Sequence, residues 1–82
     1  MTRIEILEEV NRIFCDVFDD ESLKITETTT ADDVEDWDSL EHINLINEIE
    51  NRFSMRFAMR EITGMKNVGE MIDIIVQREE KK

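Results

Sequence analysis

Proline is absent from the 82-residue sequence, and only two glycines, Gly64 and Gly69, are present. Because proline and glycine mark most tight turns, their scarcity argues against a fold of many short strands. The single cysteine, Cys15, cannot form a disulfide within the chain, as is usual in a reducing compartment. No apolar run reaches a length of about 20 residues, which a membrane-spanning helix needs. These absences favour a small helical protein that does not insert into a membrane.

Basic residues are also scarce. Ten Lys and Arg residues stand against 21 Asp and Glu residues, so the formal net charge is −11. Nucleic acid and anionic lipid surfaces repel such a chain, which argues against both as partners. The segment MTRIEILEEV lacks the apolar core of a signal peptide, which predicts a cytoplasmic protein. Ten acids and one base lie between Asp16 and Asp38, where they form either a solvated loop or a surface for basic partners.

A chain of 82 residues, 40% of them hydrophobic, is long enough to form one small hydrophobic core but not two. The sequence therefore predicts a single domain over residues 1–82. Apolar residues recur at spacings of three and four, the period of an α-helix, in three stripes. The first stripe contains Ile4, Leu7, Val10, Phe14, Val17 and Phe18. The second contains Leu40, Ile43, Ile46, Ile49 and Phe53, and the last contains Val68, Met71, Ile72, Ile75 and Val76.

Helix ends are also marked in the sequence. The three long helices each begin with a potential capping box, formed by Thr2 with Glu5, Asp38 with Glu41, and Asn67 with Glu70. A short third helix is expected over residues 59–62, closed by Gly64 as its C-terminal cap, and the final EEKK is expected to fray. The sequence therefore predicts an all-α four-helix bundle with a long loop, residues 19–37, between helices 1 and 2. The loop side chains expected to pack onto the core are Leu23, Ile25, Val34 and Trp37.

Catalytic chemistry has few candidates. His42, the only histidine, lies near the apolar stripe of its helix, which predicts a packed or partly buried side chain. Ser39 precedes it by three residues, but no third group is evident to orient the imidazole, and no oxyanion site is visible. No acidic segment has the glycine of an EF-hand loop. We therefore expect no catalytic residues, no metal site and no enzymatic activity.

Ser39 has a distinctive position. It follows the probable cap residue Asp38 at the start of a helix and at the end of the long acidic loop. A phosphate diester attached to its hydroxyl would lie near unpaired backbone N–H groups and the positive end of the helix dipole. Ser39 is therefore a candidate attachment site as well as an ordinary serine of a helix N-terminus.

The residues from Asp38 onward match a known pattern. Asp38-Ser39-Leu40 continues as EHINLINEIENRF, which contains Glu50 and Phe53 in an E-x-x-F spacing. The segment NVGEMI follows near the end of the chain. In this order and at this length, the segments resemble the acyl carrier protein family over nearly the whole chain. The resemblance implies a carrier that has no catalytic activity of its own.

The resemblance also implies a prosthetic group on Ser39. A phosphopantetheinyl transferase would place 4'-phosphopantetheine from coenzyme A on its hydroxyl, and the terminal thiol of this arm would carry acyl groups as thioesters. Asp38 would help to present the serine and would contact the transferase. Leu40 and Ile43 would flank the arm or line a pocket for short acyl chains. Cys15 would have no part in this chemistry.

Partner enzymes are the next implication of the resemblance. Glu41, Glu48 and Glu50 match positions at which family members present carboxylates to basic surfaces, and Ile43 lies among them. The expected partners are the transferase and the enzymes that load and transfer acyl groups. The chain itself is expected to be a monomer.

Several residues depart from the pattern. Asn44 and Asn47 stand where many fatty-acid carriers have an acid and a methionine, so the second helix is less acidic than usual. Arg52, Arg56 and Arg60 recur at a spacing of four and add a basic patch just after it. These departures favour a free-standing carrier of a specialised pathway over the housekeeping carrier.

The cargo stays open at this point. The turn E-D-W-D-S lacks the glycine common in carriers of fatty-acid synthesis, and Trp37 resembles the residue found there in carriers of dedicated or modular pathways. The sequence thus favours a specialised pathway among fatty acid, polyketide and related biosyntheses. Two alternatives share these features. A peptidyl or aminoacyl carrier protein would have the same fold and serine, and an unmodified acidic helical adaptor would not accept the prosthetic group.

Overall fold

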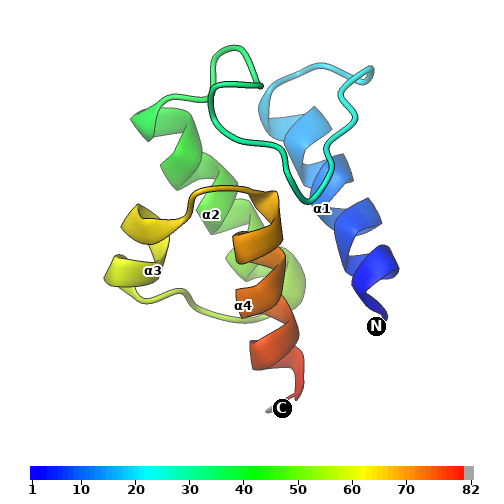
Figure 1. Cartoon of the computed structure of the whole chain (residues 1–82), viewed down its shortest axis with the longest axis vertical. Helices are drawn as coiled ribbons and strands as arrows, with labels where there is room; N and C mark the ends of the chain where they lie inside the picture. The colour runs from blue at the N-terminus through cyan, green and yellow to red at the C-terminus, as the bar shows by residue number, and fades with distance from the viewer. Residues whose placement is uncertain (81–82) are drawn as a thin grey trace.

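Four helices make up the fold in the computed structural model, which describes residues 1–80 (Figure 1). They are α1 (Arg3–Val17), α2 (Ser39–Phe53), α3 (Met59–Gly64) and α4 (Val68–Glu80). No strand occurs within the described residues, and residues 18–38 join α1 to α2 without a helix. The predicted all-α fold, with its long loop and short third helix, is confirmed. None of the described helices is long and apolar enough to cross a membrane.

The long helices pack around one core. α1 contacts both α2 and α4, and the short α3 lies on the side of the molecule opposite α1 (Figure 1). The long loop covers the end of the bundle at which α1 ends and α2 begins. Of the predicted frayed end, Glu79 and Glu80 are helical, whereas Lys81 and Lys82 lie outside the described residues.

The inward face of α1 differs from the predicted stripe. Val10 and Phe14 are buried as expected, but Ile6 and Ile13 complete the buried face. Ile4 is 70% exposed, so its assignment to the core was wrong. Residues 4 and 6 are separated by about 200° around a helix, so only one of them can face the core.

The predicted inward face of α2 was also partly wrong. Ile46, Ile49 and Phe53 are buried as predicted, and Leu45 joins them. Leu40 and Ile43 are 70% and 45% exposed, so neither belongs to the core. The position three residues before Leu45 and four before Ile46 is His42, and its half-buried side chain continues the inward stripe at the start of the helix. In α4 the predicted stripe is confirmed, with Val76 only partly buried.

Only one of the three expected capping boxes is complete. At α1 the Glu5 amide donates to the Thr2 hydroxyl oxygen, and the Thr2 amide donates to the Glu5 carboxylate, which lowers the Glu5 pKa. At α2 the Glu41 amide donates to the Asp38 carboxylate, but the Asp38 amide donates to the Asp36 carbonyl oxygen instead of to Glu41.

At α4 the Glu70 amide donates to the Asn67 side chain over 2.9 Å, but the Glu70 carboxylate accepts from the Lys66 amide and not from Asn67. The prediction of Gly64 as a C-terminal cap was also wrong. Gly64 is the last helical residue of α3, and Met65 follows in an extended conformation. A left-handed residue does end α2, where Ser54 has a φ of 52°.

The long loop is held down at its centre by α1 and α4. The Asn11 side chain accepts from the Ile25 amide over 2.7 Å and donates to the Leu23 carbonyl oxygen over 3.2 Å. The amides of Val68 and Gly69, in the first turn of α4, donate to carbonyl oxygens of the loop. As predicted, the loop packs onto the core through the buried residues Ile25 and Val34 and the half-buried residues Leu23 and Trp37.

An ion-pair cluster fixes the same part of the loop to both helices. Arg3 in α1 donates to the Glu27 carboxylate over 2.6 Å and lies 2.7 Å from the Asp73 carboxylate in α4. The hydrogen bonds from Arg3 lower the pKa of Glu27, so this carboxylate stays ionised further into the acidic range than usual. The cluster complements the backbone hydrogen bonds between the loop and α4.

We predict that Gly69→Ala destabilises the protein, whereas Gly64→Ala does not. An added Cβ at position 69 would lie 2.8 Å from the Glu27 carbonyl oxygen, a backbone atom. The loop or α4 must then shift, and we expect a loss of about 1–3 kcal/mol in the free energy of unfolding. Position 64 has no heavy atom within 4 Å of an added Cβ, and alanine there should stabilise α3 by up to about 1 kcal/mol. Urea unfolding measures both, and equal stabilities would contradict the close approach at Gly69.

Candidate functional site

Ser39 is the first residue of α2 and is exposed. Its hydroxyl makes no hydrogen bond within residues 1–80, and so it is free to react. The preceding residue, Asp38, is extended, and its carboxylate accepts from the Glu41 amide over 2.9 Å. The amides of Ser39 and Leu40 have no acceptor in the described part of the chain. The start of α2 thus presents a hydroxyl beside two free N–H donors.

The chain turns sharply just before Ser39. Asp36 has a φ of 71°, a left-handed conformation that costs most side chains energy but that Asp adopts more readily. The Asp38 amide closes the turn by donating to the Asp36 carbonyl oxygen over 2.9 Å. In the turn E-D-W-D-S, Asp36 therefore adopts the left-handed conformation that glycine adopts at less cost.

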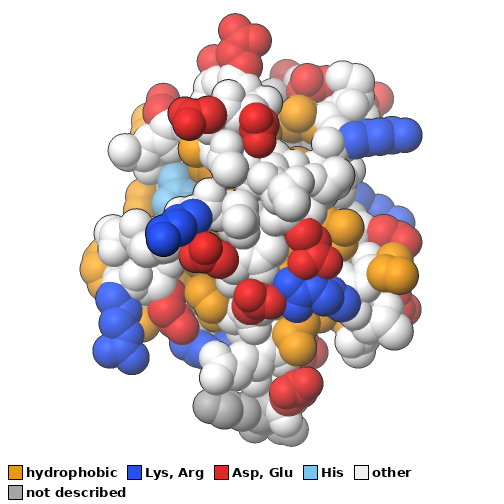
Figure 2. Space-filling model, viewed as in Figure 1, with side chains coloured by type: hydrophobic (Ala, Val, Ile, Leu, Met, Phe, Trp, Pro, Cys, Tyr) orange, Lys and Arg blue, Asp and Glu red, His pale blue; other side chains and the backbone are white. Residues whose placement is uncertain are grey.

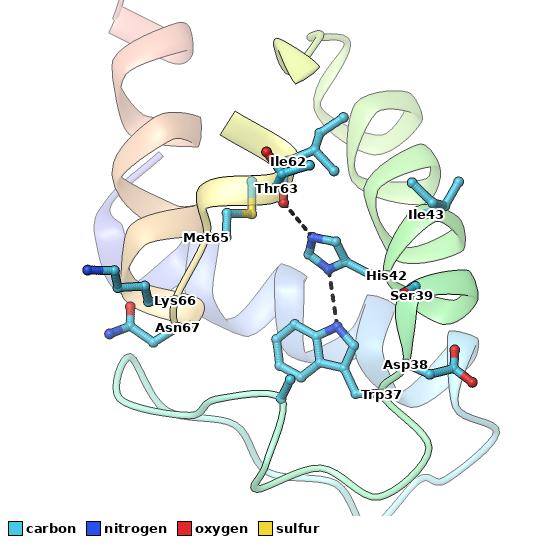
Figure 3. Close-up of a pocket in the computed structure, with 11 residues that line it drawn as sticks. Trp37, Asp38, Ser39, His42, Ile43, Ile62, Thr63, Met65, Lys66 and Asn67 are labelled. Atoms are coloured by element: carbon cyan, nitrogen blue, oxygen red, sulfur yellow. Dashed lines mark hydrogen bonds between the residues drawn. The ribbon is translucent and has the colours of Figure 1, made fainter. Parts of the chain in front are cut away.

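Trp37 and His42 connect this turn to α3 (Figure 3). The Trp37 indole Nε1–H donates to Nδ1 of His42 over 3.1 Å, and Nε2 of His42 lies 2.9 Å from the Ile62 carbonyl oxygen. The Trp37 ring also packs edge-on against Phe14 of α1, with 5.1 Å between the ring centroids. The prediction of a partly buried His42 is confirmed, and its side chain joins the loop, α2 and α3.

An open pocket of about 500 Å³ lies beside Ser39, between the start of α2 and α3. Trp37, His42 and Ile43 line it on the α2 side, and Ile62 and Met65 line it on the α3 side, as Figure 3 shows. Its lining is mainly apolar, with polar atoms contributed by residues such as Thr63, Lys66 and Asn67. The pocket can therefore take an apolar group that reaches it from the Ser39 hydroxyl.

Glu61 fixes the position of α3. Its carboxylate accepts from the Ala58 amide over 2.8 Å and from Arg78 of α4 over 2.6 Å. The hydrogen bond from Ala58 is the main cause that lowers the Glu61 pKa, and Arg78 acts in the same direction. This anchor is therefore kept at neutral pH and is lost only as the pH falls through the lowered pKa.

The structure gathers most of the predicted site residues at the start of α2. Ser39 lies between Asp38 and the exposed Leu40, and Ile43 lines the pocket one turn further along. Glu41 and Glu48 lie on another side of α2, along an open groove between α2 and the end of α1. The groove is lined by Asp16, Val17, Glu41, Asn44, Asn47 and Glu48.

Glu50 is oriented differently. Only 11% of its side chain is exposed, and its carboxylate accepts from the Phe57 amide over 2.8 Å. Its geometry therefore supports a role in holding the connection between α2 and α3, and does not support the predicted contact with partners. The predicted basic patch is also divided, because Arg52 pairs with Glu9 and Asp16, whereas Arg56, whose side chain is 90% exposed, lies 3.6 Å from the Glu50 carboxylate.

The residues that form the wall of the pocket were not predicted from the sequence as a group. Trp37 was expected to pack with the loop and His42 to be packed or partly buried in its helix, but the hydrogen bonds that His42 makes with Trp37 and Ile62 were not predicted. The spacing of His42 from Leu45 and Ile46 is a signal that could have placed the imidazole on the inward side. The α3 side, including Met65, gives no comparable signal because the orientation of so short a helix depends on tertiary contacts.

Comparison with known proteins agrees with this geometry. The family described as "Phosphopantetheine attachment site" matches residues 8–75 of the chain. The fold is also similar to the solution NMR structure of a holo acyl carrier protein from Geobacter metallireducens. The two chains are 39% identical, and the alignment covers 92% of this chain and 86% of that chain with a TM-score of 0.85.

The fold and site define a small helical carrier with an exposed serine at a helix start. The chain belongs to the phosphopantetheine attachment site family and resembles the acyl carrier proteins. It is a carrier protein, not an enzyme, and its prosthetic group is phosphopantetheine, which a phosphopantetheinyl transferase supplies. The site fits this group, since the Ser39 hydroxyl is free, exposed and next to an open pocket.

We predict that Asp38→Ala destabilises α2, whereas Asp38→Asn does not. The Asp38 carboxylate caps the helix by accepting from the Glu41 amide, and an asparagine side-chain oxygen can accept in the same way. Loss of the cap should lower the free energy of unfolding by about 1 kcal/mol. Urea unfolding followed by circular dichroism measures the difference. If the two variants are equally stable, the cap is not what stabilises the start of α2.

Proposed function

We propose that this chain is an acyl carrier protein that bears 4'-phosphopantetheine on Ser39. When bound, the group supplies a thiol that holds acyl intermediates as thioesters. The proposal rests on one observation above all: the one serine at the start of a described helix has a free, exposed hydroxyl beside a mainly apolar pocket. The identity to an acyl carrier protein favours an acyl cargo over an aminoacyl one.

The residues around Ser39 have distinct roles in this proposal. Asp38 caps α2 and so fixes the direction in which the serine hydroxyl points. Leu40 offers an apolar contact to the transferase and flanks the arm, since its side chain is exposed next to Ser39. Ile43 contributes to the pocket that receives the start of an acyl chain.

We further propose that residues 1–82 form one carrier domain, monomeric and cytoplasmic, that shuttles intermediates between enzymes of a specialised biosynthesis. Fatty acid and polyketide synthesis are the pathways proposed, because their intermediates are acyl groups held as thioesters. Nucleic acids and membrane insertion have no part in this function, since the net charge of −11 disfavours phosphate surfaces.

Replacement of Ser39 tests the attachment site directly. We expect wild-type protein to gain the mass of one phosphopantetheine when incubated with coenzyme A and a broad-specificity transferase, and Ser39→Ala to gain none. The variant should fold normally, because the Ser39 hydroxyl makes no hydrogen bond in the described chain. Intact-mass spectrometry and circular dichroism measure the two properties.

Ser22→Ala is the matched control, since Ser22 is also exposed but lies in the long loop. It should gain the same mass as wild type. Mass gain in Ser39→Ala would contradict Ser39 as the attachment site. No gain in wild type with several transferases would contradict the carrier function itself.

Recognition by partners is proposed to use the acidic side of α2. Glu48 is exposed and Glu41 is half-exposed, and neither has an ion pair within residues 1–80. Carboxylates that remain unpaired can attract a basic enzyme surface and raise the association rate more than the final affinity. Contacts of this kind are weak, about 0–1 kcal/mol for each charge, as a shuttle requires.

We predict that the double reversal Glu41→Lys/Glu48→Lys slows transfer of phosphopantetheine at low salt, and that added salt reduces the effect. The matched control is Glu8→Lys/Glu80→Lys, which changes the net charge equally at exposed acids of α1 and α4. The initial transfer rate at several salt concentrations is the measurement. Equal rates for the two double variants at low salt would rule out the Glu41 and Glu48 side of α2 as the docking surface.

A further inference from the structure

Both ring nitrogens of His42 have hydrogen-bond partners, and the partners fix its protonation state. The Ile62 carbonyl oxygen can only accept, so the nitrogen 2.9 Å away, Nε2, carries a proton. The Trp37 indole N–H can only donate, so Nδ1, at 3.1 Å, carries none. Both hydrogen bonds can exist together only when His42 is a neutral imidazole with its proton on Nε2.

The His42 imidazole links parts of the molecule that meet at Ser39. Trp37 is separated from Ser39 only by Asp38, Ile62 lies on α3, and both line the same pocket as Ser39 (Figure 3). The backbone amide of Trp37 adds one bond to the Val34 carbonyl oxygen, at 3.3 Å. His42 is thus the polar contact that ties the residues leading into Ser39 to the opposite wall of the pocket.

Protonation would affect the two hydrogen bonds in opposite ways. A second proton on Nδ1 would turn this nitrogen into a donor that faces the indole N–H, so the bond to Trp37 is lost. The bond from Nε2 to Ile62 remains and becomes charge-assisted. The indole ring cannot compensate through a cation–π contact, because the imidazole meets its N–H edge, where the ring is positive.

Within residues 1–80, no charged side chain forms a hydrogen bond or ion pair with the imidazole that would offset this change. Trp37 of the loop and Ile62 and Thr63 of α3 contact the imidazole or line the pocket beside it, and their side chains are uncharged. Phe14 of α1, which packs on Trp37, is uncharged as well. The charged residues of the pocket are Asp38 and Lys66, and both side chains point away from the imidazole in Figure 3. The Asp38 carboxylate is instead bound to the Glu41 amide.

We propose that His42 is a positioning residue for Ser39, which in its neutral form holds Trp37 against the α3 side of the pocket and on protonation releases Trp37 while staying on Ile62. The Trp37 ring then keeps its packing on Phe14 but loses the polar link across the pocket. This inference depends on the proposed function in one respect only, namely that Ser39 is the residue that is modified. The hydrogen bonds and their test concern the unmodified chain.

The chain has a single tryptophan and a single histidine, so NMR reports on this contact without ambiguity. We would follow the indole N–H, the imidazole nitrogens and the Ser39 amide of unmodified protein as the pH is lowered, and use the imidazole nitrogen signals to find where His42 gains its second proton. We expect neutral His42 with its proton on Nε2. As it titrates, indole N–H exchange, corrected for intrinsic pH dependence, should rise roughly three- to tenfold and the Ser39 amide signal should shift.

Two variants separate the contact from general effects of acid. In Trp37→Phe the indole donor is absent, so the Ser39 amide should no longer follow the His42 titration. In His42→Gln the side chain cannot be protonated, so the indole signal should lose its response over the pH range in which His42 titrates. An Nδ1–H tautomer of neutral His42, or an indole signal that ignores the imidazole titration, would overturn the proposal. Neither result would bear on whether Ser39 accepts phosphopantetheine.

Discussion

Hydrogen bonds between the long loop and the first turn of α4 hold the fold in the form that positions Ser39. The first amides of a helix have no partner within it, and a loop without secondary structure leaves its carbonyl oxygens unpaired. In this protein the helix amides donate to the loop carbonyl oxygens, so both sets of groups are paired. The Val68 amide donates to the Thr29 carbonyl oxygen over 2.9 Å, and the Gly69 amide donates to the Glu27 carbonyl oxygen over 2.7 Å. This close approach requires a residue without Cβ at position 69.

Further contacts hold the rest of the loop in place, from its middle to the residues just before Ser39. Asn11 and Arg3 bind the loop to α1, and Trp37 packs on Phe14 and binds His42. The loop, residues 18–38, carries nine acids, and Figure 2 shows acidic side chains gathered at the top of the view, over the loop. Without these contacts it would expand through mutual repulsion. The loop is thus fixed on both sides of its acidic segment, while the Ser39 hydroxyl stays free of contacts. This combination of a held backbone and a free hydroxyl suits a residue that must be modified by another protein.

The sequence was sufficient for the helices and for the start of α2, because apolar spacing and capping residues are local signals. It was insufficient for the direction in which several side chains face. Ile4 and Leu40 are apolar but exposed, since the rotation of a helix is set by packing with its neighbours. Glu50 carries a charge but turns inward to bind the Phe57 amide, a partner seven residues away across a turn. The link between Trp37, His42 and Ile62 also joins three elements, and only the folded chain brings them together.

The residue that carries phosphopantetheine in modified wild-type protein decides whether Ser39 is the attachment site. Proteolytic fragments of the holo protein, analysed by tandem mass spectrometry, would assign the added mass to a residue. We expect the whole of the added mass on Ser39, at the capped start of α2, and no modification of the fragments with Ser22 and Ser54. A modified fragment that lacks Ser39 would contradict this expectation.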